Sequence, residues 1–390
     1  MSTASVHTTC SPDDMPFPEE DLRFDKKSRP GYFPAWLGQA LGEGRLGRFV
    51  SLKILTCEAT CALKSERSDE IGLLRRIVDG DRSHPGSQHV IEFYDDFEFD
   101  GPEGPHRCIV AEVLALSVDF FRKAGSESDW RLHPSHVKGI VKNVLLGLDY
   151  LHRSCNIVHT DLKPDNILFR PDDVNSVVSA ALVDEPSLTY GCATNVRPPV
   201  VPVQTQVLSM RAGGAHPSGD LVDAVIADFG HSHWRDRHFQ EEIQPFALRA
   251  PEVILGCEWD TPADIWSVGC LTMEFMIGCW LFEATTTPTW SRTEDHLARM
   301  VEALEEEFPI EMIKKGKHSS LYFNEDGIFA HFTTHLEPSL PLRASLASLS
   351  IFPDDKVEIE AATAFVKRCL CLRPEDRASA NDLANDPWLT

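Results

Sequence analysis

The stretch His159-Thr160-Asp161-Leu162-Lys163-Pro164-Asp165-Asn166 holds three side chains that could act together in catalysis. Asp161 supplies a carboxylate that could orient a hydroxyl and accept its proton, an effect of about 10²- to 10⁴-fold for a positioned acid–base group. Lys163 supplies a cation that could offset negative charge developing on a phosphate. Asn166 supplies an amide oxygen, a ligand type that magnesium accepts. The spacing predicts transfer of a phosphoryl group to a hydroxyl.

A second magnesium ligand is predicted at Asp228, in Asp228-Phe229-Gly230. This tripeptide follows a short apolar run at residues 224–227 that is typical of a buried strand. Gly230 allows the backbone to turn sharply after the ligand. We therefore expect Asn166 and Asp228 to hold the metal.

The nucleotide would be bound by residues upstream of this loop. We predict that Lys53 contacts the α and β phosphates and that Glu70 holds Lys53 in place through a charge-assisted pair. Glu112 and Leu114 are predicted to lie in the hinge strand that meets the adenine. ATP and Mg²⁺ are the cofactors that this set predicts.

A glycine-rich pattern, Gly42-Glu43-Gly44-Arg45-Leu46-Gly47, stands too close to Lys53 to serve as a phosphate cradle. Lys53 follows Gly47 by only six positions, and at about 3.3 Å per residue this length covers one strand. A phosphate-binding loop followed by a return strand and a turn needs more residues than this. A glycine loop that could cradle the phosphates is therefore predicted to be missing between Gly38 and Val50. We expect weaker nucleotide binding and an exposed sheet edge as consequences.

The first part of the chain has the pattern of a small β-rich lobe. Residues 50–55 are typical of a strand, and residues 69–78 have acids in a first turn followed by apolar residues at helical spacing. Residues 89–94 and 108–114 predict two further strands.

The later part is mainly helical. After Pro134, which suits a first helical turn, apolar residues recur at helical spacing as far as Leu151. Helical patterns continue over three further segments, residues 264–282, 296–307 and 358–372. The fold class predicted is α+β, with two lobes: a small β-rich N-lobe with a truncated sheet and a large, mainly helical C-lobe.

The predicted boundaries follow composition. Residues 1–30 mix Ser, Thr, Pro and charge without apolar periodicity and are predicted to be a disordered tail. The N-lobe, incomplete, would span 31–116 and the C-lobe 117–390. An insertion loop is predicted at 171–221, where Pro, Ser, Gly and Val carry no sustained period.

The amino-acid composition limits the classes of partner that the protein is expected to bind. A net charge of −23, from 60 acidic and 37 basic residues, argues against a nucleic-acid backbone or an anionic membrane and favours a basic protein substrate. The acidity could also do no more than keep the protein in solution. Eleven cysteines without paired spacing argue against zinc and disulfides. No signal peptide is visible, which predicts a cytoplasmic or nuclear location.

These residues resemble the protein kinase family over nearly all of the chain from Val50. The order is Lys53, Glu70, the eight-residue loop and Asp228, and three scaffold residues follow. The scaffold residues are Glu252 in Arg249-Ala250-Pro251-Glu252, Asp264 at the start of a helix, and Arg377, placed late enough to pair with Glu252.

Within that family the chain is similar to the SR-protein kinases. Thr160 stands where most protein kinases have an arginine that grips a phosphate on the activation segment, and a threonine cannot do so. Other matches are Glu241-Glu242-Ile243-Gln244, Leu281-Phe282-Glu283-Ala284 and Asp295-His296-Leu297-Ala298-Arg299-Met300. The resemblance implies a monomer that phosphorylates serine in Arg/Ser-rich proteins through an acidic groove, without prior phosphorylation of its own activation segment.

Two readings of the function stay open at this point. An active serine/threonine kinase is favoured because every charged residue needed for transfer is present. The alternative is a pseudokinase or docking scaffold that binds basic Arg/Ser tracts with little or no transfer, since the glycine loop is missing. Loss of transfer in an Asp161→Asn variant would favour the enzyme.

Overall fold

The computed structural model describes residues 49–101, 104–125, 129–184, 207–210, 223–332, 338–349 and 355–389. These residues divide into two compact units. The first unit contains residues 49–67, 93–115 and the described part of 171–216, and the second contains the rest. The predicted tail at 1–30 and the Gly42–Gly47 pattern lie outside the described residues.

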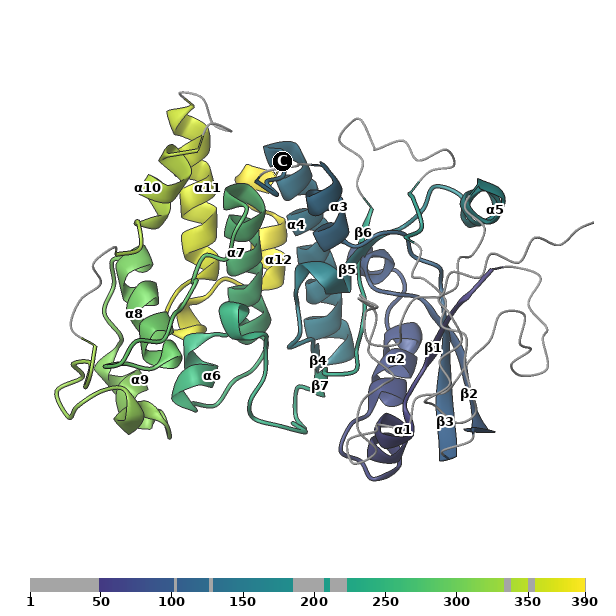
Figure 1. Cartoon of the computed structure of the whole chain (residues 1–390), viewed down its shortest axis with the longest axis horizontal. Coiled ribbons are helices and arrows are strands. Elements are labelled where there is room, and N and C mark those ends of the chain that lie inside the picture. Colours follow the sequence, from purple (N-terminus) through teal and green to yellow (C-terminus); the bar gives the residue numbers. More distant parts are fainter. Residues whose placement is uncertain are drawn as a thin grey trace, which may run out of the picture. The chain divides into compact units, whose positions relative to one another are not determined.

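The first unit is built on a three-stranded antiparallel sheet in the order β1 (Ser51–Ile54), β3 (Gly104–Ala111), β2 (Phe93–Gly101). Lys53 of β1 pairs in register with Ile109 of β3. Helix α1 (Cys57–Lys64) packs beside β3, and the Thr60 hydroxyl accepts a hydrogen bond of 3.0 Å from the Arg107 amide (Figure 1). The small β-rich lobe is therefore present, with one more helix than predicted.

Two strands differ from their predicted bounds. The run at 89–94 splits, because Val90 forms a parallel bridge with Ile226 in the second unit and β2 begins only at Phe93. The run at 108–114 begins four residues early, at Gly104, and ends at Ala111, which is the residue opposite Ser51 at the start of β1. Ladder partners, rather than apolar runs, thus set both boundaries.

Several helices were not predicted from the sequence, among them α1 and a helix within the predicted insertion loop. The Thr56 side chain caps α1 by accepting a hydrogen bond from the Ala59 amide. The segment predicted as an insertion loop begins with helix α5 (Val174–Asp184), where the Asp173 carboxylate accepts from the Ser176 amide. Residues 185–206 and 211–222 of that segment lie outside the described part of the chain.

The second unit is mainly helical and packs around α7 (Pro262–Ile277). Residues Ala263 to Met276 are all buried, and α7 contacts both α4 (Pro134–Asp149) and α11 (Lys356–Cys369) (Figure 1). The remaining α-helices of this unit are α2 (Glu70–Asp79), α3 (Val118–Gly125), α6 (Pro251–Leu255), α8 (Arg292–Leu304), α9 (Ile310–Lys315), α10 (Leu342–Ala347) and α12 (Ala380–Ala384).

Short strands and turns complete the second unit. Strand β4 (Ile157–Val158) pairs with β7 (His233–Trp234), and β5 (Ile167–Phe169) pairs with β6 (Ala224–Ile226). A π-helical turn, η2 (Tyr150–Cys155), extends α4 toward β4. Single 3₁₀ turns are η1 (Pro85–His89), η3 (Pro164–Asn166), η4 (Phe246–Leu248), η5 (Ser319–Leu321), η6 (Pro374–Asp376) and η7 (Pro387–Leu389).

Residues 68–92, including α2, group with the helical unit although the sequence places them within the predicted N-lobe. The apolar face of α2 explains this grouping, since Ile71, Leu73, Leu74 and Ile77 are buried. The predicted domain boundaries themselves stay a prediction. No helix among the described residues is both long and apolar enough to cross a lipid bilayer.

A buried ion pair joins α6 to the turn η6. Both terminal nitrogens of the Arg377 guanidinium donate to the Glu252 carboxylate, at 2.5 and 2.7 Å, and both side chains are almost fully buried. Arg377 also donates to the Pro262 carbonyl at 3.0 Å, at the start of α7. The pairing predicted from sequence is confirmed, and it fixes three segments of the second unit to one another.

We expect the variant Arg377→Leu to lower the free energy of unfolding by about 3–5 kcal/mol, because it leaves the Glu252 carboxylate buried and unpaired. Urea denaturation of the purified chain measures this value. The control is Arg373→Leu, which removes an exposed pair with Glu311 at 3.3 Å and should cost less than about 1 kcal/mol. Equal losses in the two variants would contradict the prediction.

Candidate active site

Three of the predicted catalytic side chains lie together in the second unit. The Asp161 carboxylate accepts one hydrogen bond from the Lys163 ammonium and one from the Asn166 side-chain amide, each of 2.9 Å. The same amide nitrogen donates to the Asp161 carbonyl at 2.9 Å. Because the nitrogen of Asn166 faces Asp161, its amide oxygen faces the other way and is available to a metal.

The loop that carries these residues is anchored by Asp264, in the first turn of α7. The fully buried Asp264 carboxylate accepts the backbone N–H groups of His159 and Thr160, each at 2.8 Å, and the His152 ring at 2.8 Å. Burial alone would raise the pKa of Asp264, but the hydrogen bond and the electrostatic interaction with His152, together with the nearby His159 ring and amide, bring it below its ordinary value. The anion is therefore the stable form.

Thr160 adopts a left-handed backbone conformation, with φ of 63°. For a β-branched residue this conformation costs free energy and persists only where neighbouring contacts hold it. The amide contact with Asp264 supplies one of these, and the Thr160 hydroxyl supplies another by donating to the His231 carbonyl at 2.7 Å. The backbone turn that presents Asp161 is thus imposed from outside the loop.

His159 connects the loop to the Asp228-Phe229-Gly230 segment. Its Nε2 lies 3.1 Å from the Ala227 carbonyl, which can only accept, so Nε2 carries the proton. The other ring nitrogen then accepts from the Asp161 amide at 3.3 Å. The ring also meets Phe229 edge-on, with centroids 5.2 Å apart. One buried histidine thereby ties the predicted base to the segment of the predicted metal ligand.

The two predicted metal ligands lie at the same end of a strand pair. The Ala227 amide donates to the Asn166 carbonyl at 2.9 Å, which continues the β5–β6 ladder and places Asp228 beside Asn166. Asp228 has φ of 64°, which turns the chain, and its carboxylate accepts from the Gly230 amide at 3.3 Å. An amide oxygen and a carboxylate oxygen are hard donors, and this small set fits Mg²⁺, which keeps waters and phosphate oxygens as its other ligands.

The predicted nucleotide-binding residues are divided between the two units. Lys53 lies on the exposed strand β1, and Glu112 and Leu114 follow β3, all in the first unit. Glu70 is the first residue of α2 in the second unit and is buried. The roles of these four residues, including the pairing of Lys53 with Glu70, stay predictions.

A buried histidine lies between Gly230 and Ala250, the stretch that the family resemblance makes the activation segment. His233 is 1% exposed, its Nδ1 lies 3.4 Å from the Thr160 hydroxyl, and Trp259 packs against it edge-on. Burial, together with the neighbouring His238, lowers the pKa of His233 to about 4. A neutral imidazole therefore occupies the space beside Thr160.

Gln244 fixes the end of the same segment to α7. Its side-chain nitrogen donates to the Ala263 carbonyl at 2.7 Å and to the Ser267 hydroxyl at 2.9 Å, and its oxygen accepts the Ala250 amide at 2.9 Å. The residue is buried and has φ of 68°. The run containing Gln244 was noted in the sequence only as a family match, since its partners lie up to 23 residues away.

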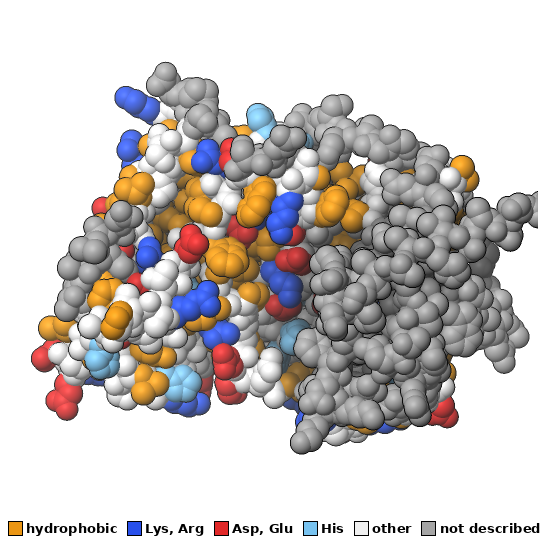
Figure 2. Space-filling model, viewed as in Figure 1, with side chains coloured by type: hydrophobic (Ala, Val, Ile, Leu, Met, Phe, Trp, Pro, Cys, Tyr) orange, Lys and Arg blue, Asp and Glu red, His pale blue; other side chains and the backbone are white. Residues whose placement is uncertain are grey.

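A cavity of about 330 Å³ lies beside the catalytic loop, which is the eight-residue stretch 159–166. Pro164 and Asp165 form part of the cavity wall. Its charged lining has four carboxylates, Asp119, Asp165, Glu274 and Glu283, against two cations, Arg122 and Lys123. The face shown in Figure 2 carries charged side chains of both signs over α4 and α7, with apolar side chains between them. The cavity itself is acidic.

Glu274 and Arg122 are the buried members of that charged lining. Burial raises the pKa of the Glu274 carboxyl, and the ion pair with Arg122 offsets only part of this effect. Among the described residues, one Glu274 oxygen has no hydrogen-bond partner. Leaving such an oxygen unpaired in the interior costs free energy.

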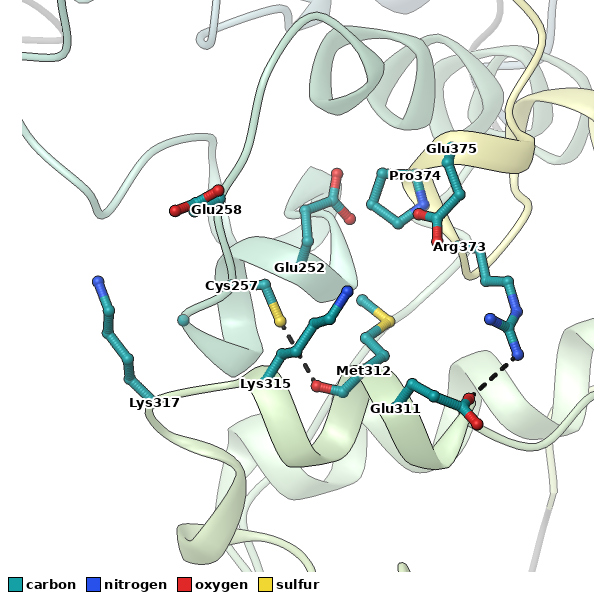
Figure 3. Close-up of a pocket in the computed structure, with 11 residues that line it drawn as sticks. Glu252, Cys257, Glu258, Glu311, Met312, Lys315, Lys317, Arg373, Pro374 and Glu375 are labelled. Carbon is teal, nitrogen blue, oxygen red and sulfur yellow. Dashed lines mark hydrogen bonds and ion pairs between the residues drawn. The ribbon is translucent and has the colours of Figure 1, made fainter.

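A larger cavity of about 510 Å³ lies between α6, α9 and η6 (Figure 3). Two carboxylates in its wall already form ion pairs, Glu252 with Arg377 and Glu311 with Arg373. Figure 3 shows Lys315 extending into the cavity from α9. None of the residues predicted to carry chemistry lines this cavity, so it is not the candidate active site.

Comparison with known proteins identifies the family. The model of the protein kinase domain matches residues 37–195 and 219–389. The chain is 33% identical to the serine/threonine-protein kinase SRPK of Physarum polycephalum, over 95% of this chain and 86% of that protein. It is 27% identical to the human SRSF protein kinase 3, over 88% of this chain and 82% of that protein.

A crystal structure of a kinase domain matches the fold with a TM-score of 0.62 at 21% identity, over 88% of each chain. This likeness confirms the two-lobed α+β fold predicted from sequence. The alternative of a non-catalytic scaffold has no support in these comparisons. The chain is a serine/threonine protein kinase and belongs to the SR-protein kinase family.

Proposed function

We propose that this kinase transfers the γ-phosphate of Mg-ATP to serine or threonine hydroxyls in Arg/Ser-rich proteins. The observation that carries the proposal is the Asp161–Lys163–Asn166 cluster, in which 2.9 Å hydrogen bonds hold the base, the cation and a metal-ligand amide around one carboxylate. The names of the relatives that it resembles support the substrate class.

Each residue has a definite part in this proposal. Asp161 orients the acceptor hydroxyl and takes its proton as the oxygen attacks. Lys163 releases its contact with Asp161 to meet the transferring phosphate and offsets its negative charge. Asn166 and Asp228 hold magnesium, which when bound neutralises phosphate oxygens. Lys53 and Glu70 align the phosphates, and Glu112 and Leu114 receive the adenine.

The acidic cavity supports a basic substrate. Asp165 lies four residues after Asp161, so a side chain bound there belongs to a peptide whose hydroxyl can reach the base. Among the described residues, Asp165 and Glu283 have no ion-pair partner, and the indole of Trp280 beside them is half exposed. Carboxylates beside an aromatic face suit a guanidinium. We further propose that the kinase acts in the cytoplasm or nucleus, in line with this substrate class and with the sequence.

We expect Asp161→Asn to lower kcat by about 10²- to 10⁴-fold on an Arg/Ser peptide, because the amide cannot accept the hydroxyl proton. Radiolabelled phosphate transfer measures the rate, and thermal stabilisation by Mg-ATP shows that the variant still binds nucleotide. The exposed Asp326→Asn variant is the control and should keep the wild-type rate. A rate within tenfold of wild type in Asp161→Asn would contradict the role of the base.

We expect the double variant Asp165→Asn/Glu283→Gln to raise the KM for an Arg/Ser peptide, by roughly up to fivefold for each partly exposed charge removed. The KM for ATP should not change, because neither residue is proposed to touch the nucleotide. A peptide with glutamine in place of arginine should show no such difference. Glu325→Gln, on an exposed turn, is the control; an unchanged peptide KM in the double variant would rule out the cavity as an arginine site.

We expect phosphatase treatment to leave the activity intact. The hydroxyl of Thr160 is bonded to the His231 carbonyl, and the neighbouring space holds His233, so the activation segment is fixed without a phosphate. Mass spectrometry before and after treatment verifies that phosphate has been removed. A loss of most of the activity would show that the segment needs phosphorylation.

A further inference from the structure

A side-chain hydrogen bond joins the activation segment to helix α2. The indole nitrogen of Trp234 donates to the Asp69 carboxylate at 2.9 Å. Trp234 lies six residues after Asp228, and Asp69 is the capping residue immediately before Glu70. All four residues belong to the second unit.

The two oxygens of Asp69 have separate tasks. One oxygen accepts the Gly72 amide at 3.2 Å and caps α2, and the other accepts the Trp234 indole. Gly72 makes this arrangement possible, because a Cβ at that position would lie only 2.5 Å from the capping oxygen. The geometry at the amino end of α2 therefore requires Gly72, Asp69 and Trp234 together.

The carboxyl end of α2 is held by different contacts. The Tyr150 hydroxyl donates to the Ile77 carbonyl at 2.5 Å, and Arg76 donates to the carbonyls of Ser154 and Cys155. These contacts attach α2 to the turn η2. If the indole hydrogen bond at the amino end of α2 is lost, the carboxyl end of the helix stays attached. We therefore expect the amino end, which carries Glu70, to move relative to η2.

Trp234 is itself fixed to the strand that leads into the catalytic loop. In the β4–β7 ladder it lies opposite Ile157, and the adjacent Arg235 amide donates to the Asn156 carbonyl at 2.9 Å. Strand β4 ends at Val158, three residues before Asp161. A short chain of backbone and side-chain bonds thus runs from the catalytic loop to α2.

We propose that Trp234 is a positioning residue that fixes the amino end of α2, and with it Glu70, relative to the catalytic loop. The indole bond needs no phosphate and persists whatever the phosphorylation state of the activation segment. The inference rests on the proposed function only for its kinetic consequence, which follows from the alignment of the nucleotide phosphates by Glu70 through Lys53.

Two variants remove the bond in different ways. Trp234→Phe keeps the ring and loses the N–H, whereas Asp69→Ser keeps a capping oxygen but is too short to meet the indole. We expect each to raise the KM for Mg-ATP by about tenfold, as for a lost hydrogen bond to a charged group, with the peptide KM unchanged. The double variant should be no worse than either single variant, because both remove the same contact.

Hydrogen exchange provides a readout that does not depend on activity. Amides near the amino end of α2, from Ile71 to Leu74, should exchange faster in both variants, while those near Ile77 keep the wild-type rate. Gly72→Ala should give the same exchange pattern despite the better helix propensity of alanine, since its Cβ displaces the Asp69 carboxylate. If the chain phosphorylated no substrate, this exchange pattern would still decide the inference.

The matched control is Trp388→Phe. It removes another indole–carboxylate hydrogen bond of the second unit, between Trp388 and Glu358 at 2.8 Å, and should leave the KM for Mg-ATP and the exchange of α2 unchanged. Wild-type KM and wild-type exchange in both Trp234→Phe and Asp69→Ser would overturn the proposal. Additive effects of the two substitutions would overturn it as well.

Discussion

The geometry of the active site depends on the buried carboxylate of Asp264. It accepts two consecutive backbone N–H groups, those of His159 and Thr160, and the ring of His152. An anion without these donors would not be stable in the core, and a loop without the anion would not hold Thr160 at positive φ. Because α7 is buried along nearly its whole length, the loop inherits the rigidity of the core.

Buried ion pairs have a similar positioning task elsewhere in the second unit. Glu252 with Arg377 ties α6 to η6, and Arg122 with Glu274 ties α3 to α7. Desolvation offsets much of the attraction within such pairs, so their main effect is to fix one arrangement of the segments rather than to add stability.

Several of the contacts that hold the activation segment have uncharged donors. His233 meets Thr160, the Trp234 indole reaches Asp69, and the Gln244 side chain bridges α7 and Ala250. Hydrogen bonds between neutral donors and fixed acceptors do not depend on a modifying enzyme.

The sequence by itself determined the elements and groups whose partners are close along the chain. Asp161, Lys163 and Asn166 span six residues, so their cluster follows from local geometry, and the long apolar period after Pro134 gave α4. The pairing of Arg377 with Glu252 was also predicted, but from the family resemblance rather than from local geometry.

Tertiary structure alone decided the contacts that close long loops. The His159–Asp264 and Asp69–Trp234 bonds join residues 105 and 165 positions apart, and no periodicity of one segment encodes them. A long-range contact also explains why β2 begins later than predicted, since Val90 pairs with Ile226 and not with a strand of the three-stranded sheet. A segment's pattern records which face is buried, whereas the partner of that face is chosen only when the whole chain packs.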